Sequence, residues 1–338
     1  MWDFSVGQAF GLMRRTAPFV LFRVVVYFGI AAALVIVTGA GAGVGYGVGA
    51  FGDTEFRAQS TAWGAVGGFG LTAGVIFFLR DYLLYIVKAG HIAVMVELMQ
   101  GGSLPAGRGQ IDFARAVVTR RFGTASALFG LDQLIKGVVG AITGLVQGVL
   151  SLLPIPGLDR IMGVVRAYLR LAVGLVDEVI LAHLMATRAE NPWKGAQEAL
   201  VLYGQNARVM MVNAAWLAGI VWLLSIAVFV AMLAPAAAVV YLMPGDLAAG
   251  GFVFAFLFAW AVKAALIEPF AIACMMQVFF TVTAGQTPNP EWAAKLASAS
   301  DKFKELGTRA GNWAGARLSK GAGVAPPGGP QGGETQRV

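Results

Sequence analysis

The chain has 338 residues, of which 58% are hydrophobic and only 13% are charged, and its mean hydropathy is +0.72. Soluble globular proteins are about 45–50% apolar and about 25% charged, so the composition excludes a soluble protein and indicates an integral membrane protein. The net charge is +7, but the basic residues lie beside apolar stretches, where orientation and anionic lipid explain them better than nucleic acid does. We therefore expect the lipid bilayer as a partner and no nucleic acid.

The sequence predicts six transmembrane helices. Six apolar stretches reach or exceed the roughly 20 residues that cross a bilayer, at about 18–50, 63–87, 125–153, 161–185, 209–234 and 250–282. We predict an all-α polytopic fold in which residues 1–286 form the membrane domain. Pro235 and the stretch Met243 to Asp246 are expected to break the chain between the fifth and sixth spans.

The same order of elements occurs three times. A short amphipathic helix that begins with an aromatic residue, at Phe4, Phe113 or Trp193, precedes a span, a short loop and a returning span. The period is roughly 90–110 residues, far longer than that of solenoid repeats. We predict three hairpins, each preceded by an amphipathic surface helix. They are either internal repeats, which transporters often carry, or the product of packing preference alone.

The basic residues predict the orientation. Most of them flank the start of the first span, the loops between the second and third and between the fourth and fifth spans, and the C-terminal segment: Arg14, Arg15, Arg23, Arg108, Arg115, Arg120, Arg121, Arg188, Lys194, Arg208, Lys295, Lys302, Lys304 and Arg309. The opposite loops carry only Arg57 and Arg160, each beside an acid. The positive-inside rule then predicts that both termini are cytoplasmic.

The fourth apolar stretch carries an unusual stripe of charge. Arg166, Arg170 and Asp177 fall within roughly 40° of one another on a helix of 100° per residue, and Glu178 follows directly. Ionisable side chains in lipid are costly, so such a stripe is expected to face the bundle interior or a water-filled cavity. We expect the other helices to cover it.

Ionisable residues also occur in other spans. Asp132 and Lys136 have the i,i+4 spacing of an ion pair. When the three returning spans are aligned, Lys88, Asp177 and Glu268 become equivalent, and three-fold packing would bring one cation and two carboxylates together. These groups either line a pathway for an ion, a proton or a charged solute, or neutralise one another and fix the helix register. The candidate polar interior consists of Arg80, Asp81, Lys88, Arg166, Arg170, Asp177, Glu178, Lys263 and Glu268.

Glycines repeat at helical spacing in the first three spans. The first span carries two faces of small residues, Gly39/Gly43/Gly47 and Gly41/Gly45/Gly49, and the same spacing recurs at Gly70/Gly74 and Gly140/Gly144/Gly148. Small residues at this spacing let helix backbones approach closely in membranes. Both faces of the first span are therefore expected to pack against neighbouring helices.

Motifs of known catalysis are missing from the sequence. The histidines, His91 and His183, belong to no His-Glu-x-x-His motif, and there is neither a phosphate-binding loop nor a Gly-x-Ser-x-Gly elbow. An acid/base pair made of Asp177 and Glu178 would have poor geometry, because adjacent helical residues point about 100° apart. We predict no enzymatic activity, no cofactor and no metal.

The C-terminal segment predicts an amphipathic helix. Asn289-Pro290 is a helix start, and an apolar stripe with heptad spacing follows, made of Trp292, Leu296, Ala299, Phe303, Leu306, Ala310 and Trp313. We predict a cytoplasmic helix over 289–318 that either lies on the membrane or contacts another subunit, as a homo-oligomer or with a membrane-protein partner. The Pro/Gly-rich tail at 319–338 is expected to be disordered.

One segment resembles known families. The aromatic-headed helix at 192–208, which leads straight into a span, is similar to the pattern of uncharacterised bacterial six-helix membrane families and of the membrane domain attached to some glycerophosphodiester phosphodiesterases. The resemblance implies an architecture and a bacterial cytoplasmic (inner) membrane location, but no activity. Two functions are expected from the residues: binding or passage of a small charged solute or ion, or a non-catalytic membrane scaffold or assembly factor that acts through its surface helices and C-terminal helix.

Overall fold

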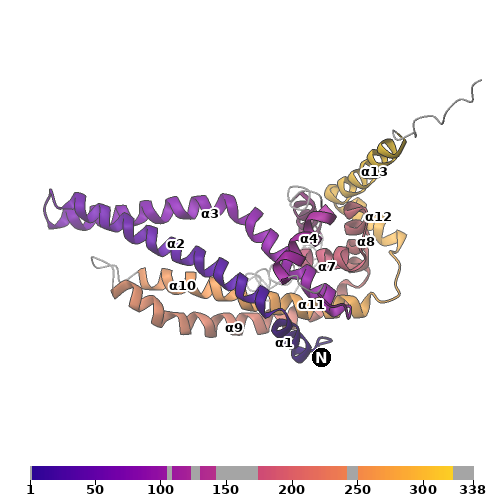
Figure 1. Ribbon diagram of the computed structural model, residues 1–338, viewed down its shortest axis with the longest axis horizontal. Coiled ribbons are helices and arrows are strands. Elements are labelled where there is room, and N and C mark those ends of the chain that lie inside the picture. Colours follow the sequence, from indigo (N-terminus) through magenta and orange to yellow (C-terminus); the bar gives the residue numbers. More distant parts are fainter. Residues whose placement is uncertain (1, 105–108, 123–129, 142–173, 242–249, 323–338) are drawn as a thin grey trace, which may run out of the picture.

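A computed structural model describes residues 2–104, 109–122, 130–141, 174–241 and 250–322, with the side chains of 78–83, 121, 122, 250, 251 and 315–322 outside the description. Every regular element in these ranges is a helix (Figure 1), which confirms the predicted all-α class. Most of the third and fourth predicted spans, including Arg166 and Arg170, lies outside the described residues.

Four helical stretches in the described ranges are long and apolar enough to cross a membrane: Ala17–Gly49, Thr54–Phe77, Ala207–Tyr241 and Phe252–Val282. They belong to α2 (Ala17–Gly49), to α3 (Thr54–Met99), to α9 (Ala207–Tyr241), and to α10 (Gly250–Val262) with α11 (Glu268–Val282). Figure 1 shows α2 with α3 and α9 with α10 as long neighbouring pairs that reach away from the remaining helices. Their outer faces carry exposed apolar side chains such as Leu21, Trp63 and Leu223, as expected for surfaces in contact with lipid.

One predicted boundary of these spans was wrong, and the sixth span, whose predicted bounds agree with the candidate span Phe252–Val282, contains an irregular turn. Pro235 does not end the fifth span but lies inside α9, which continues to Tyr241; proline is tolerated in membrane helices because neighbouring groups satisfy the freed backbone. The sixth span is not one regular helix. A π-helix, η1 (Lys263–Ile267), separates α10 from α11.

One glycine face of α2 packs closely against α3. A Cβ atom on Gly41 would collide with the carbonyl oxygen of Gly64, and one on Gly64 would collide with that of Gly41. Gly45 lies in the same way against the backbone of Ser60. The other predicted face is not used within the described residues, because a Cβ on Gly43 or Gly47 would meet nothing within 4 Å. The same is true of Gly70, Gly74 and Gly140, while Gly144 and Gly148 lie outside the description.

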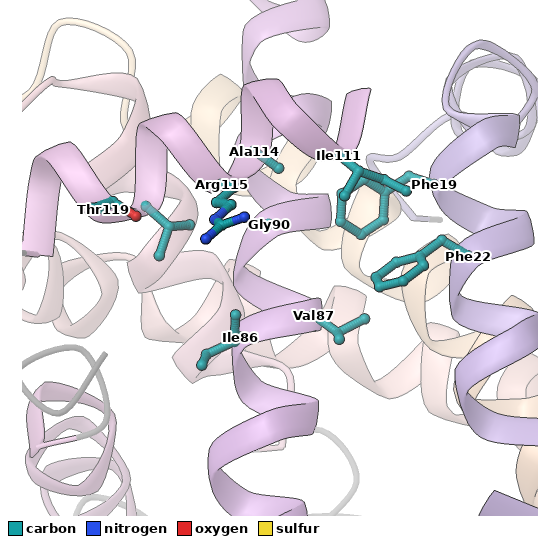
Figure 2. Close-up of a pocket in the computed structure, with 10 residues that line it drawn as sticks. Phe19, Phe22, Ile86, Val87, Gly90, Ile111, Ala114, Arg115 and Thr119 are labelled. Carbon is teal, nitrogen blue, oxygen red and sulfur yellow. The ribbon is translucent and has the colours of Figure 1, made fainter. Parts of the chain in front are cut away.

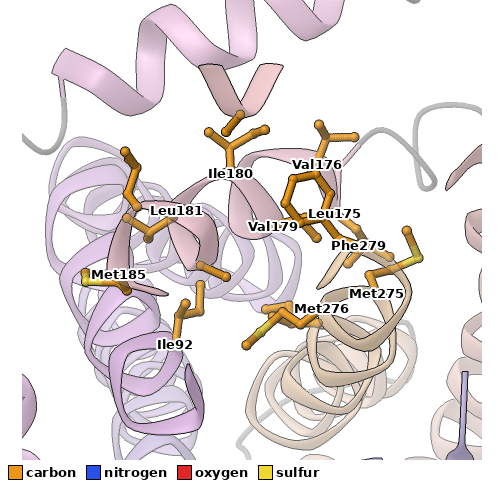
Figure 3. Packing of buried hydrophobic residues seen from close by; sticks show 14 of the residues in the cluster. Ile92, Leu175, Val176, Val179, Ile180, Leu181, Met185, Met275, Met276 and Phe279 are labelled. Carbon is orange, nitrogen blue, oxygen red and sulfur yellow. The ribbon is translucent and has the colours of Figure 1, made fainter. Parts of the chain in front are cut away.

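The main hydrophobic core lies at the other end of the long helices. Here α7 (Val176–Ala186) packs between α3 and α11, with nearly all of its residues buried. Figure 3 shows this packing from the labelled side chains Ile92, Val176, Val179, Ile180, Leu181, Met275, Met276 and Phe279. This core holds the C-terminal part of α3 against α7 and α11. It thereby positions the charged residues of these three helices, Lys88, Glu178 and Glu268.

The three short helices that were predicted to precede the hairpins are α1 (Val6–Arg15), α4 (Gln110–Phe122) and α8 (Pro192–Gln205). The predicted N-cap of α8 is present, because the Asn191 side chain accepts hydrogen bonds from the backbone N–H groups of Trp193 and Lys194 at 3.2 Å. However, the apolar side of α8 is covered by other helices of the same chain. Trp193, Leu200 and Tyr203 are buried, since α7 covers one side of α8 and the C-terminal helices cover another.

The C-terminal segment forms two helices rather than the predicted single one. Between α12 (Pro290–Ala299) and α13 (Asp301–Ala322), Ser300 adopts an extended backbone with φ −146° and ψ 117°. The apolar stripe is buried within the chain through Leu296, Phe303, Leu306 and Ala310, with α13 against α8. This packing corrects the expectation that the stripe faces the membrane or another subunit. The helix also continues to Ala322, beyond the predicted start of the disordered tail.

Candidate polar site

A polar pocket of about 200 Å³ opens between the long helices and the broken sixth span. Its walls come from α2, α3, the helix at 130–141, α10, η1 and α11, through Tyr27, Leu84, Tyr85, Lys88, Lys136, Trp260, Ala264 and Glu268. Two ammonium groups, one carboxylate and three aromatic rings with polar atoms therefore line the same space. Polar groups that converge from separate helices are typical of membrane-protein binding sites.

Lys88 is held by α7. Its Nζ donates to Oε1 of Glu178 at 2.6 Å, and the Glu178 side chain is almost wholly buried. Burial opposes the charged form of Lys88, and the contact with Glu178 offsets that cost. The lysine has its stem along α3 and its head at the pocket wall.

Lys136 enters the pocket from the helix at 130–141. Its Nζ donates to Oδ2 of Asp132 at 2.6 Å and lies 3.8 Å from Oδ2 of Asp177. The expected i,i+4 pair is thus present, with a second carboxylate from α7 beside it. Half of the Lys136 side chain is exposed, and its Nζ lies 5.8 Å from the centre of the Tyr85 ring. Lys136 is therefore the most open of the charged groups in the wall.

The third charged wall residue, Glu268, depends on the π-helix. The Glu268 N–H donates to the carbonyl of Lys263, five residues earlier, rather than to that of Ala264, as a regular helix requires. Pro269, the next residue, has no N–H that could donate to the Ala264 carbonyl instead. The freed carbonyl of Ala264 instead accepts a hydrogen bond from Nη2 of Arg23 on α2.

Arg23 lies behind this wall and is fully buried. Its Nη2 is 3.7 Å from Glu268 Oε2, while Lys263 Nζ is 3.2 Å from Glu268 Oε1. Two further guanidinium nitrogens, Nε and Nη1, have no hydrogen-bond partner among the described residues. The Tyr27 ring, which lines the pocket, lies 5.5 Å from the guanidinium carbon.

The described charged side chains of this region are paired. Four basic side chains (Arg23, Lys88, Lys136 and Lys263) lie 2.6–3.8 Å from four acidic ones (Asp132, Asp177, Glu178 and Glu268). Such pairing lowers the cost of holding ionised groups away from water.

Five of the predicted residues lie in the pocket wall or directly behind it. Lys88 and Glu268 line the pocket, Lys263 pairs with Glu268, and Asp177 and Glu178 lie behind the lysines. Lys88 hydrogen-bonds Glu178 rather than Asp177, the residue that the three-fold alignment made equivalent to it. Arg80 and Asp81 lie on α3 with side chains outside the description, and Arg166 and Arg170 lie outside the described residues altogether.

Sequence reasoning missed several contributors, among them Arg23, Tyr27 and Tyr85. Arg23 was assigned to orientation, although its position six residues into the apolar run of α2 is a signal of burial. Tyr27, one turn later on the same face, and Tyr85 carry no charge and gave no signal. Their role follows only from the pocket geometry.

His91 belongs to the packed interior, whereas His183 is half-buried with its ring edge-on to Phe279 at 5.6 Å. His91 Nε2 lies 3.0 Å from Thr16 Oγ1, and its ring stacks on Phe19 at 5.0 Å. Burial, helped by the charge of Arg23, lowers the pKa of His91 to about 3, so the ring is neutral at physiological pH. The described part of the chain contains no group of three or more histidine, cysteine or acidic side chains that could hold a metal ion.

No protein-family model, curated protein or solved structure matches this chain. The resemblance of the segment at 192–208 therefore stays a prediction, and the function must be argued from the site.

Proposed function

We propose that this protein is a multi-pass membrane protein that binds a small charged solute or ion in the polar pocket and passes it through the bundle. In this proposal all six predicted spans cross the bacterial cytoplasmic membrane as three hairpins, and both termini are cytoplasmic. Four apolar helices of sufficient length support the membrane location, and the placement of the basic residues supports the orientation.

The observation that carries the proposal is the convergence of Lys88, Lys136 and Glu268 on one space. These residues come from three different helices, and each has its counter-charge behind the wall rather than across the pocket. Side chains paired only to fix helix register would close on one another without leaving room between them. An anionic group of a solute would meet Lys88 and Lys136, and a cationic group would meet Glu268 beside the Tyr27 and Trp260 rings.

The alternative of a membrane scaffold has less support. It was motivated by the surface helices, the glycine faces and the apolar stripe of the C-terminal helix, and that stripe packs against the core of the same chain. The exposed charged side chains described on α13 form ion pairs within the helix, such as Arg309–Glu305 at 2.7 Å.

The test is ligand-dependent stabilisation of the purified full-length chain in detergent. Glutamate, lysine, glycine betaine and sodium chloride are added over a concentration series, and the unfolding temperature is recorded. A ligand that binds only the folded state stabilises it by about 2.7 kcal/mol at one hundred times its dissociation constant. We expect at least one probe to raise the unfolding temperature.

The matched variants are Glu268→Gln in the pocket and Glu198→Gln, whose side chain is 44% exposed on α8. The proposal predicts that Glu268→Gln shifts the concentration dependence of a probe with a cationic group at least tenfold, that Lys136→Gln does the same for an anionic probe, and that Glu198→Gln leaves both unchanged. Equal responses of the pocket and control variants, or no response to any probe, would argue against a solute site here.

A further inference from the structure

A second pocket, separate from the polar one, lies where the first span meets α4. Its volume is about 320 Å³. Figure 2 shows Phe19 and Phe22 of α2 on one side, Ile86 and Val87 of α3 below, and Arg115 and Thr119 of α4 on the other side. Ile111, Gly90, Ala114 and Val118 complete the lining. The pocket is therefore apolar over most of its wall and polar at one edge.

The position of the pocket connects it with the membrane-facing surface. Phe19 and Phe22 belong to the first two turns of the candidate span Ala17–Gly49. On the same helix, Val25 lies about 60° around the helix from Phe22 and is 63% exposed, so the surface of α2 next to Phe22 is apolar and uncovered. Lipid chains that cover this face can reach the pocket without leaving the apolar layer.

The polar edge of the pocket carries a cation, Arg115, that is unpaired among the described residues. Arg115 is the charged residue of the lining, it is exposed, and it makes no hydrogen bond or ion pair with any described residue. Asp112, one turn earlier on α4, is exposed as well and forms no ion pair with it. Thr119 lies one turn after Arg115, so a guanidinium group and a hydroxyl group lie side by side on one face of α4.

We propose that this pocket binds an anionic phospholipid of the surrounding membrane. One acyl chain lies against Phe19, Phe22 and Val87, and the phosphate accepts hydrogen bonds from the Arg115 guanidinium and the Thr119 hydroxyl. An arginine fork matches the phosphate geometry, and an apolar floor continuous with the lipid-facing side of α2 takes a chain rather than a soluble anion. The lipid thereby joins α4 to the base of the first hairpin.

The test compares two lipids of identical acyl chains, phosphatidylglycerol and phosphatidylcholine, by native mass spectrometry of the full-length chain released from detergent. The variants are Arg115→Gln and, as the matched control, Arg120→Gln, which is exposed on the same helix and does not line the pocket. We expect the wild type to retain phosphatidylglycerol at least tenfold better than phosphatidylcholine. Arg115→Gln should remove most of that preference, and Arg120→Gln should keep it.

A third variant tests the chain pocket. Val87→Trp fills the apolar floor and should lower the retention of both lipids, with the unfolding temperature of lipid-free protein as the check that it folds. If Val87→Trp is unfolded, the comparison of the two arginine variants decides alone. Equal retention of the two lipids by the wild type would overturn the proposal. So would an equal loss of preference in Arg115→Gln and Arg120→Gln, because that result shows unspecific attraction of lipid to a basic helix.

Discussion

Arg23 and Ala264 are separated by 241 positions in the sequence, yet the guanidinium group of the first donates a hydrogen bond to the backbone carbonyl of the second. That carbonyl is free only because η1 shifts the Glu268 N–H to Lys263 and because Pro269 has no N–H. A charged side chain of the first span thus supplies the hydrogen bond that the backbone of the last span lacks. This bond lies next to Glu268, which lines the pocket.

Removing this arginine should therefore destabilise the fold through the π-helix. Arg23→Met leaves the Ala264 carbonyl without its donor and Glu268 with one cation fewer, and breaking a buried pair costs about 3–5 kcal/mol. The unfolding temperature in detergent measures the loss. Pro269→Ala restores an N–H to the helix, so the loss caused by Arg23→Met should be smaller in a Pro269→Ala background. The same loss of stability in both backgrounds would show that Arg23 does not act through the π-helix.

Lys88 and Glu178 should show strong coupling. Lys88→Met leaves the Glu178 carboxylate buried without its cation, at a cost of about 3–5 kcal/mol, and Glu178→Met removes that unpaired charge again. The double variant should be more stable than Lys88→Met alone. Lys194→Met, which breaks a pair of exposed side chains with Glu198, should cost less than about 1 kcal/mol. Additive effects of the two core substitutions would contradict the pairing at 2.6 Å.

The two glycine faces of α2 should respond differently to substitution. Gly41→Leu places a side chain against the Gly64 backbone and must separate α2 from α3, whereas Gly43→Leu points into open space. We expect Gly41→Leu to lower the unfolding temperature by several degrees and Gly43→Leu to leave it within about one degree, since surface substitutions usually change stability by less than about 0.5 kcal/mol. Similar losses in both variants would show that the second face packs as well.

Burial of His91 predicts acid sensitivity. Its pKa is lowered from 6.5 to about 3 in the fold, so the unfolded chain binds the proton more readily and stability falls as the pH drops below 6.5. The slope approaches about 1.4 kcal/mol per pH unit, and the loss between pH 7 and pH 5 is about 2 kcal/mol. Unfolding temperatures of wild type and His91→Gln over this range measure it. The variant should lose this part of the pH dependence.

The helical class and the polar interior could be predicted because both follow from single-chain patterns. Long apolar stretches predict membrane helices wherever they occur, and charges inside them predict an interior position. For this reason Lys88, Glu178, Lys263 and Glu268 could be singled out before the helices were placed. The cap at Asn191-Pro192 is equally local, and it is present.

The features that could not be predicted depend on contacts between segments far apart in the sequence. The apolar stripe of α12 and α13 has the spacing of a membrane-surface or coiled-coil helix, and only the position of α8 shows that it is covered by the same chain. Likewise, the spacing of the glycines cannot say which of two equivalent faces meets α3. The π-helix depends on Pro269 and on Arg23 together, and no pattern within either span reveals that combination.

The central claim is that the polar pocket is open to solutes, and a cysteine in its wall tests this most directly. Leu84 lines the pocket, and the native Cys274 is buried, so the variant is Leu84→Cys in a Cys274→Ser background. A membrane-impermeant thiol reagent is applied to inside-out and right-side-out vesicles, with wild-type protein as the unlabelled control. We expect Leu84→Cys to be labelled from at least one side and the labelling to be reduced by the probe that stabilises the purified protein. Protection from both sides, with full labelling after denaturation, would mean a closed set of structural ion pairs and would contradict this claim.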